Sequence, residues 1–144
     1  MGVSIRCQKT GRTIDLGYFG FARLRRKVAE LAGGPFFTLY QEVQGYSSLS
    51  STESPEEFDA RINAELERLV AAKQVDLKIA DFLLQPDERG KIRYGACKNI
   101  LKAIGDYNDK VLYGYAGRPD CARFSDFRRI LEDCAATKSD LTWC

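Results

Sequence analysis

The chain has 144 residues, 44% of them hydrophobic and 29% charged, and its net charge is +2. This length and composition suit one domain with an ordinary hydrophobic core, and the small net charge predicts no strong attraction to bulk nucleic acid. The sequence has no histidine, so it lacks the commonest metal ligand and the commonest acid–base group at neutral pH. We therefore expect a protein that is not an enzyme and has no catalytic residue, metal or cofactor.

The N-terminal part of the sequence predicts a β-hairpin followed by a helix. Residues 3–7 and 13–16 alternate apolar and polar side chains, and Gly11 lies in the turn between them. The next apolar residues recur at helical spacing and end at a glycine pair: Phe21, Leu24, Val28, Leu31, Gly33 and Gly34. The basic residues of this helix are expected on its solvent-exposed faces: Arg23, Arg25, Arg26 and Lys27.

Two further helices are predicted on either side of a polar loop. Pro35 can open a helix over residues 35–44. After the loop, Ser54 and Glu57 have the spacing of a capping box, and this helix should run to about Lys73. The chain is expected to be a single domain, 1–144, and the loop marks a possible division. The units on its two sides would be residues 1–46 and 54–144.

The remaining sequence predicts two more helices and several short strands. Strands are expected at 75–79 and 111–115, helices at 94–104 and from Phe124 to Cys134, and a final strand or tail at 141–143. The predicted fold class is α+β, mostly helical, with an N-terminal β-hairpin and a few short strands.

The stretch from Tyr113 to Asp120, with the sequence YGYAGRPD, combines aromatic, glycine, arginine and carboxylate residues. Glycine allows a ligand to approach the backbone, an aromatic ring stacks on a base, and arginine binds phosphate through a planar fork of donors. This mixture favours a nucleotide ligand. The alternative is a strand that ends in a turn before a helix.

Two groups of residues are candidates for phosphate or nucleotide binding. The first combines basic, amide and aromatic side chains, and its alternative is a polar rim around the core. Its members are Phe82, Arg93, Asn99, Lys102, Tyr113, Tyr115 and Arg118. The second is a glycine-rich turn at 17–20 that leads into a basic helix start with Arg23 and Arg26. Its alternative is a solvated basic face.

Cysteine usage and hydropathy predict a cytoplasmic protein. The five cysteines are an odd number without a CxxC pair, as in proteins with free thiols in a reducing compartment. No segment approaches the about 20 apolar residues that span a bilayer, and the first residues lack the apolar core of a signal peptide. We expect no membrane partner.

Several segments together resemble small proteins of clostridial prophages, and among these the first type of phage anti-Thoeris sponge proteins. The segments are GVSIRC at 2–7, RTIDLGY at 12–18, FARLR at 21–25, DFLLQ at 81–85, GKIRYGACKNI at 90–100, YGYAGRPDC at 113–121, FSDFRRILEDC at 124–134 and DLTW at 140–143. The resemblance covers nearly the whole chain except residues 45–60.

The resemblance implies that the protein sequesters cyclic ADP-ribose isomers, signals of bacterial immunity, without cleaving them. It also implies a homo-oligomer, either a dimer or a trimer of dimers, whose larger assemblies also bind cyclic trinucleotides. On chemical grounds, Arg93 and Arg118 would then hold phosphates, with Lys102 nearby. Asn99 and Asp120 would bond ribose or base, and Phe82 or Tyr115 would stack. A second phosphate-rich ligand would use the basic helix start, namely Gly20, Arg23, Arg26 and Lys27.

Two other functions are compatible with the sequence. A protein-interaction factor of a phage or other mobile element would use apolar residues near 36–49 as a partner surface. A nucleotide hydrolase would use carboxylates such as Asp87, Glu88 and Asp120.

Overall fold

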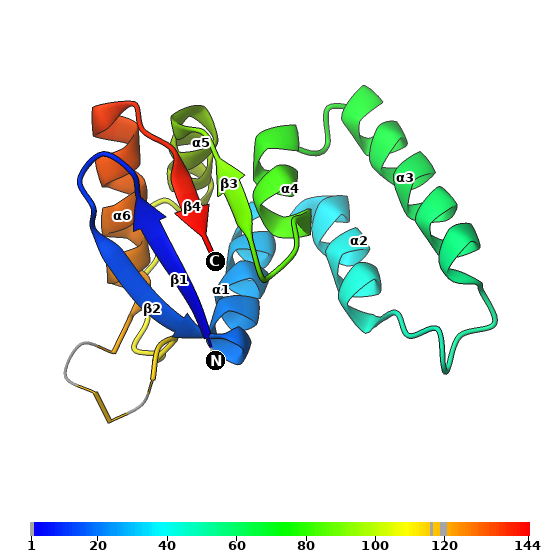
Figure 1. The fold of residues 1–144 in the computed structure, drawn as a ribbon. Helices are drawn as coiled ribbons and strands as arrows, with labels where there is room; N and C mark the ends of the chain where they lie inside the picture. The colour runs from blue at the N-terminus through cyan, green and yellow to red at the C-terminus, as the bar shows by residue number, and fades with distance from the viewer. Residues whose placement is uncertain (1, 116, 119–120) are drawn as a thin grey trace.

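A computed structural model describes residues 2–115, 117–118 and 121–144. Within this part, six helices and four strands form an α+β fold (Figure 1). The strands and helices are β1 (Gly2–Cys7), β2 (Thr13–Gly17), α1 (Tyr18–Ala32), α2 (Gly34–Gly45), α3 (Pro55–Ala71), α4 (Leu77–Leu84), β3 (Gly90–Ile92), α5 (Tyr94–Ile104), α6 (Phe124–Thr137) and β4 (Leu141–Trp143). Each helix in these described ranges is too short or too polar to span a lipid bilayer.

The four described strands form one antiparallel sheet in the order β2-β1-β4-β3. The predicted N-terminal hairpin is confirmed, with Val3 opposite Leu16 and Ile5 opposite Ile14. The C-terminal strand β4 lies between β1 and β3, where Trp143 is opposite both Ile5 and Gly90. The sheet therefore joins strands from residues 1–46 with strands from residues 54–144.

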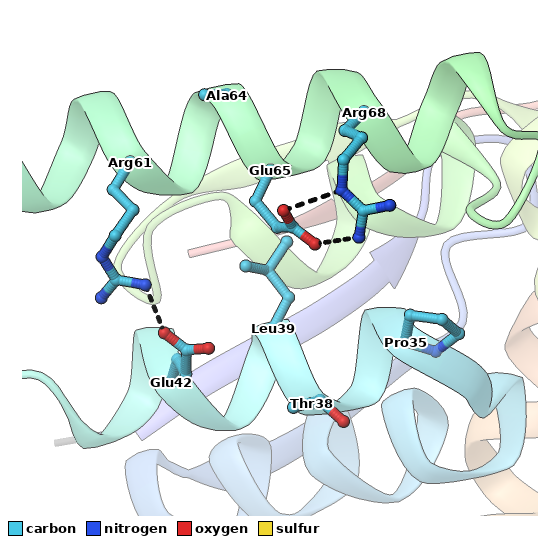
Figure 2. A pocket seen from close by; sticks show the side chains of 8 residues that line it. All are labelled: Pro35, Thr38, Leu39, Glu42, Arg61, Ala64, Glu65 and Arg68. Carbon is cyan, nitrogen blue, oxygen red and sulfur yellow. Dashed lines mark hydrogen bonds and ion pairs between the residues drawn. The ribbon is translucent and has the colours of Figure 1, made fainter.

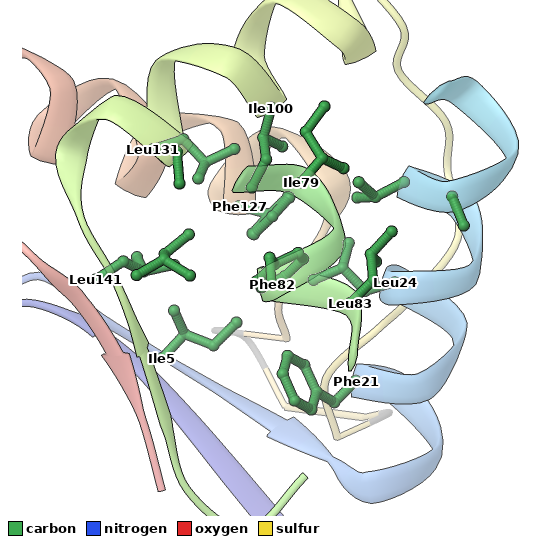
Figure 3. Close-up of a cluster of buried hydrophobic side chains, with 14 of the residues drawn as sticks. Ile5, Phe21, Leu24, Ile79, Phe82, Leu83, Ile100, Phe127, Leu131 and Leu141 are labelled. Atoms are coloured by element: carbon green, nitrogen blue, oxygen red, sulfur yellow. The ribbon is translucent and has the colours of Figure 1, made fainter. Parts of the chain in front are cut away.

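One face of the sheet is buried and the other is open, as the alternation in β1 predicts. Val3, Ile5 and Cys7 are buried under the helices, whereas Arg6 is exposed. Helices α1 and α6 contact the buried face, and α4 and α5 complete the core (Figures 1 and 3).

Two predicted strands are wrong. Residues 77–84 form α4, because the Asp76 carboxylate caps it by accepting from the Lys78 N–H at 2.9 Å. Its buried residues Ile79, Phe82 and Leu83 follow helical spacing rather than strand alternation. Residues 111–115 are irregular, and both Tyr113 N–H and Gly114 N–H donate to the Ala122 carbonyl.

Helices α2 and α3 form an arm beside the main body (Figure 1). Ser54 caps α3 as predicted, since its hydroxyl accepts from the Glu57 N–H at 3.2 Å. A hollow of about 570 Å³ lies between the two helices. Figure 2 shows Arg61 directed at Glu42 and Arg68 directed at Glu65 there. Because these arginines are already paired with carboxylates, this hollow does not favour an anionic ligand.

Arg25 departs from the expected solvent-exposed position and is 3% exposed. Its guanidinium carbon lies 4.3 Å from the ring centre of Phe21, 5.5 Å from that of Phe82 and 5.2 Å from that of Trp143. One nitrogen, Nη1, donates to the Gln85 carbonyl at 2.8 Å and to Asp87 at 3.0 Å. Burial lowers the pKa of Arg25, and the Asp87 carboxylate acts in the opposite direction.

Replacing Asp87 with alanine should leave the buried Arg25 charge without its carboxylate. Asp87 is half exposed, so water screens the ion pair, and we expect the free energy of unfolding to fall by about 1–2 kcal/mol. Urea denaturation measures this change. The neighbouring variant Glu88→Ala is the control and should change stability by less than about 0.5 kcal/mol. Equal effects of the two variants would contradict a specific contribution of the pair.

Candidate functional site

The start of α5 lies beside α4, and a hollow of about 450 Å³ opens between them. We call it the α5 hollow. Its lining combines basic, acidic, amide and aromatic side chains: Lys78, Asp81, Arg93, Tyr94, Gly95, Ala96, Lys98 and Asn99. Volumes of about 300–1,000 Å³ are typical of small-molecule sites.

Three positively charged side chains border the α5 hollow against one carboxylate. Lys78 comes from α4, and its Nζ lies 3.0 Å from where a Cβ at Gly95 would stand. Arg93 is the N-cap residue of α5, and Lys98 lies one turn into that helix. The described residues give Arg93 and Lys98 no ion pair, so their charges remain available to an anion.

The first turn of α5 adds backbone donors. The N–H groups of Ala96 and Cys97 both donate to the Arg93 carbonyl. The N–H groups before them, at Tyr94 and Gly95, are the first in the helix and have no partner within it. They lie at the positive end of the helix dipole, which favours a negatively charged group.

The α5 hollow also offers a ring and an amide. Tyr94 is 36% exposed, and Lys98 Nζ lies 5.3 Å from its ring centre. Asn99 donates from Nδ2 to Asp76 at 2.9 Å, which fixes the orientation of its side chain. Its carbonyl oxygen can still accept a bond from a ligand. A stacking face, an oriented amide and clustered cations are together suited to a nucleotide.

The predicted stacking role of Phe82 is wrong, because its ring has no face left for a ligand. The side chain is fully buried and stacks on Phe127 with 5.8 Å between ring centres. Its edge-on contacts with Phe21 and Trp143 have ring centres 6.3 and 5.5 Å apart. Figure 3 shows Phe82 in the middle of the core, so its function is packing.

The described residues of the YGYAGRPD stretch lie far from the α5 hollow. The Tyr115 ring is packed at Gly2 and Gly17, at the first end of β1, and the Arg118 guanidinium carbon lies 5.6 Å from its ring centre. Arg93 follows Ile92, which lies opposite Leu141 in the sheet. Leu141 in turn lies opposite Cys7, at the other end of β1. The length of β1 separates the two places by about 17 Å. Asp120 lies outside the described residues.

Arg93 and Asn99 are thus together in the α5 hollow, whereas Tyr115 and Arg118 are not with them. Lys102 lies further along α5, exposed, and does not line the hollow. One chain therefore does not bring the predicted site residues together as expected. The sequence prediction missed Lys78, Tyr94 and Lys98. Helical spacing places Tyr94 one turn from Lys98, but Lys78 was hidden because its segment was predicted to be a strand.

The predicted second phosphate site is only partly accessible. Gly20 lies inside α1 and is buried, and the backbone of Tyr113 covers it. Arg23 and Arg26 are exposed, and the Arg23 guanidinium carbon is 5.8 Å from the Tyr113 ring centre. Lys27 pairs with Glu30 at 3.2 Å. The backbone of Gly20 is therefore not accessible to a phosphate.

Tyr113 anchors the irregular segment that covers Gly20. Its hydroxyl donates to Asp109 at 2.7 Å. Burial and this bond to Asp109 raise the pKa of Tyr113, which keeps the phenol protonated over the ordinary pH range. Arg128 donates to the Tyr107 carbonyl nearby. The first bond lies within the segment, and the second joins the loop before it to α6.

Comparisons of the chain with models of protein families, with curated proteins and with solved structures gave no match. Within the described ranges, no group of three or more Cys, Asp or Glu side chains is placed to hold a metal ion. Function is therefore inferred from the side chains of the chain itself.

Gly20→Ala should destabilise the protein, although alanine is favoured in helices by about 1 kcal/mol. The added methyl would overlap the Tyr113 carbonyl, and we expect a net loss of about 1–3 kcal/mol in the free energy of unfolding. Gly45→Ala is the matched control, because Gly45 is also helical and has open space around it. Thermal and urea unfolding compare the two variants. If the two variants are equally stable, the segment around Tyr113 moves to accommodate the methyl group without a loss in the free energy of unfolding.

Proposed function

We propose that the protein is a non-catalytic binding protein that sequesters cyclic nucleotide signals of bacterial immunity. Cyclic ADP-ribose isomers are the first candidates, and cyclic trinucleotides are the second. The observation that carries the proposal is the α5 hollow, where Lys78, Arg93 and Lys98 gather beside Tyr94 and Asn99. In this assignment the cations bind the two phosphates of the ligand.

The other groups of the hollow have complementary roles in the proposal. Tyr94 offers a partly exposed ring on which an adenine stacks. The Asn99 amide and the Asp81 carboxylate bond the base edge or ribose hydroxyls. The resemblance to anti-Thoeris sponge proteins of phages is the reason for choosing cyclic ADP-ribose isomers among nucleotides.

Binding without turnover is consistent with the residues present. The chain has no histidine to act as a general base. Among the carboxylates that a hydrolase would use, Asp87 is already paired with the buried Arg25 at 3.0 Å. Its position is therefore better explained by stability than by catalysis.

Oligomer formation belongs to the same proposal. Within one chain, Arg93 is about 17 Å from the end of the sheet where the Tyr115 ring packs, with Arg118 beside that ring. They would contribute to one ligand only if a second subunit brought them together. A dimer or a trimer of dimers is the proposed assembly, and analytical ultracentrifugation tests it.

A protein-interaction factor is the second candidate, and exposed apolar side chains favour it. Phe19 is 89% exposed and Leu49 is 98% exposed. Among the apolar residues near 36–49 that were first considered, Phe36, Leu39 and Tyr40 are buried, whereas Leu49 is exposed. This function therefore depends on Phe19 and Leu49.

The test is calorimetric titration of the protein with cyclic ADP-ribose isomers. We expect saturable binding and recovery of unchanged ligand after heat denaturation. Arg93→Gln should weaken the affinity about 10- to 100-fold, because it removes a charge-assisted hydrogen bond. The control is Arg89→Gln, an exposed arginine in the preceding turn that does not line the hollow.

Three outcomes would contradict the proposal. Absence of heat and of thermal shift with every cyclic nucleotide would remove nucleotide binding. Recovery of cleaved ligand would favour a hydrolase. An Arg93→Gln protein that binds as tightly as the original chain would move the site away from the α5 hollow.

A further inference from the structure

A second polar hollow, of about 530 Å³, lies between the edge strand β2 and the start of α6. We call it the β2–α6 hollow. Arginines from three separate places line it: Arg12 beside the hairpin turn, Arg123 before α6, and Arg129 inside α6. None of the site residues predicted from the sequence is among its lining residues.

Within the described part of the chain, two of these arginines have no carboxylate partner. Arg12 pairs with Asp133 through Nε at 2.6 Å. The ion pairs of the described residues include neither Arg123 nor Arg129. Both side chains are exposed at the hollow, so neither guanidinium is held in a direct ion pair there.

The carboxylates that also line the hollow are engaged by other groups. Asp126 accepts from the Arg123 backbone N–H at 2.8 Å, and Asp15 accepts from the Ser4 hydroxyl at 2.6 Å. Neither forms an ion pair with Arg123 or Arg129 in the described part of the chain. Three guanidinium groups therefore border the hollow against these two carboxylates.

The open edge of β2 supplies a further donor. Ser4 exchanges both backbone bonds with Cys144, so its backbone faces away from β2. The direction of the backbone N–H and C=O groups alternates from residue to residue along a strand of an antiparallel pair. Those of Arg6, two residues after Ser4, therefore also face away from β2. Its partner Thr13 then directs its N–H outward from the sheet edge. Thr13 lines the hollow, as does the Ser125 hydroxyl.

The geometry points to a second binding site in the β2–α6 hollow, for a small molecule with two linked phosphate groups. Arg123 precedes α6 and Arg129 lies inside it, so two guanidinium groups reach the hollow from different places, which suits a ligand that carries two phosphate groups. Guanidinium groups bind phosphate oxygens through pairs of parallel bonds. The site is independent of the nucleotide site proposed at the α5 hollow.

Inorganic pyrophosphate is the probe, titrated by calorimetry into the Arg93→Gln protein so that the α5 hollow contributes little. We expect pyrophosphate to bind at least about tenfold more tightly than orthophosphate. Adding Arg129→Gln or Arg123→Gln should each weaken pyrophosphate binding about tenfold or more. Adding Arg89→Gln, an exposed arginine elsewhere, should leave the binding unchanged. Thermal unfolding checks that every variant is folded.

Absence of pyrophosphate binding in the Arg93→Gln protein would overturn the inference. Equal losses from Arg129→Gln and Arg89→Gln would do the same, because they would indicate only a general charge effect. The proposed nucleotide site is tested separately in the protein that carries Arg123→Gln and Arg129→Gln. If this protein still binds cyclic ADP-ribose isomers while losing pyrophosphate, the two sites are distinct.

Discussion

A single buried cation connects the layers of this protein. The Arg25 guanidinium lies among the rings of Phe21, Phe82 and Trp143, which belong to α1, α4 and β4. Its Nη1 reaches the loop after α4 through the Gln85 carbonyl, while Nε and Nη2 have no hydrogen-bond partner among the residues that the structure describes. A buried charge is stabilised here mainly by ring faces and by one carboxylate. The positions of the helix, the loop and the central strand therefore depend on one another.

Local patterns in the sequence were sufficient for most of the fold. The hairpin, the Ser54 cap and the helix at 94–104 each depend on neighbouring residues, and all three are confirmed. The errors come from long-range effects. Arg25 lies among basic residues on a helix, and only the rings brought by α4 and β4 make its burial possible. Residues 111–115 have strand-like composition, but in the described part of the chain they join no strand ladder, and the N–H groups of Tyr113 and Gly114 donate to the Ala122 carbonyl instead.

The candidate site was predictable only in part for the same reason. Arg93 and Asn99 come together because one helix start carries both. Phe82 was chosen as an accessible ring, yet the helix that carries it turns that face into the core. Lys78 reaches the α5 hollow only because its segment is helical and packs on α5. Sequence spacing gives neighbours within an element, whereas a binding site also needs neighbours between elements.

The position of β4 has a consequence for biosynthesis. The residues that fill the middle of the sheet are the last of its residues to leave the ribosome, so a nascent chain holds β1 and β3 with their inner edges unsatisfied. Non-local pairing of this kind slows folding, and open strand edges can pair with strands of other chains and aggregate. Translation that stalls shortly before residue 141 would leave an incomplete sheet without Trp143, prone to aggregation and proteolysis. Cellular quality control would therefore discriminate between chains that carry β4 and chains interrupted before it.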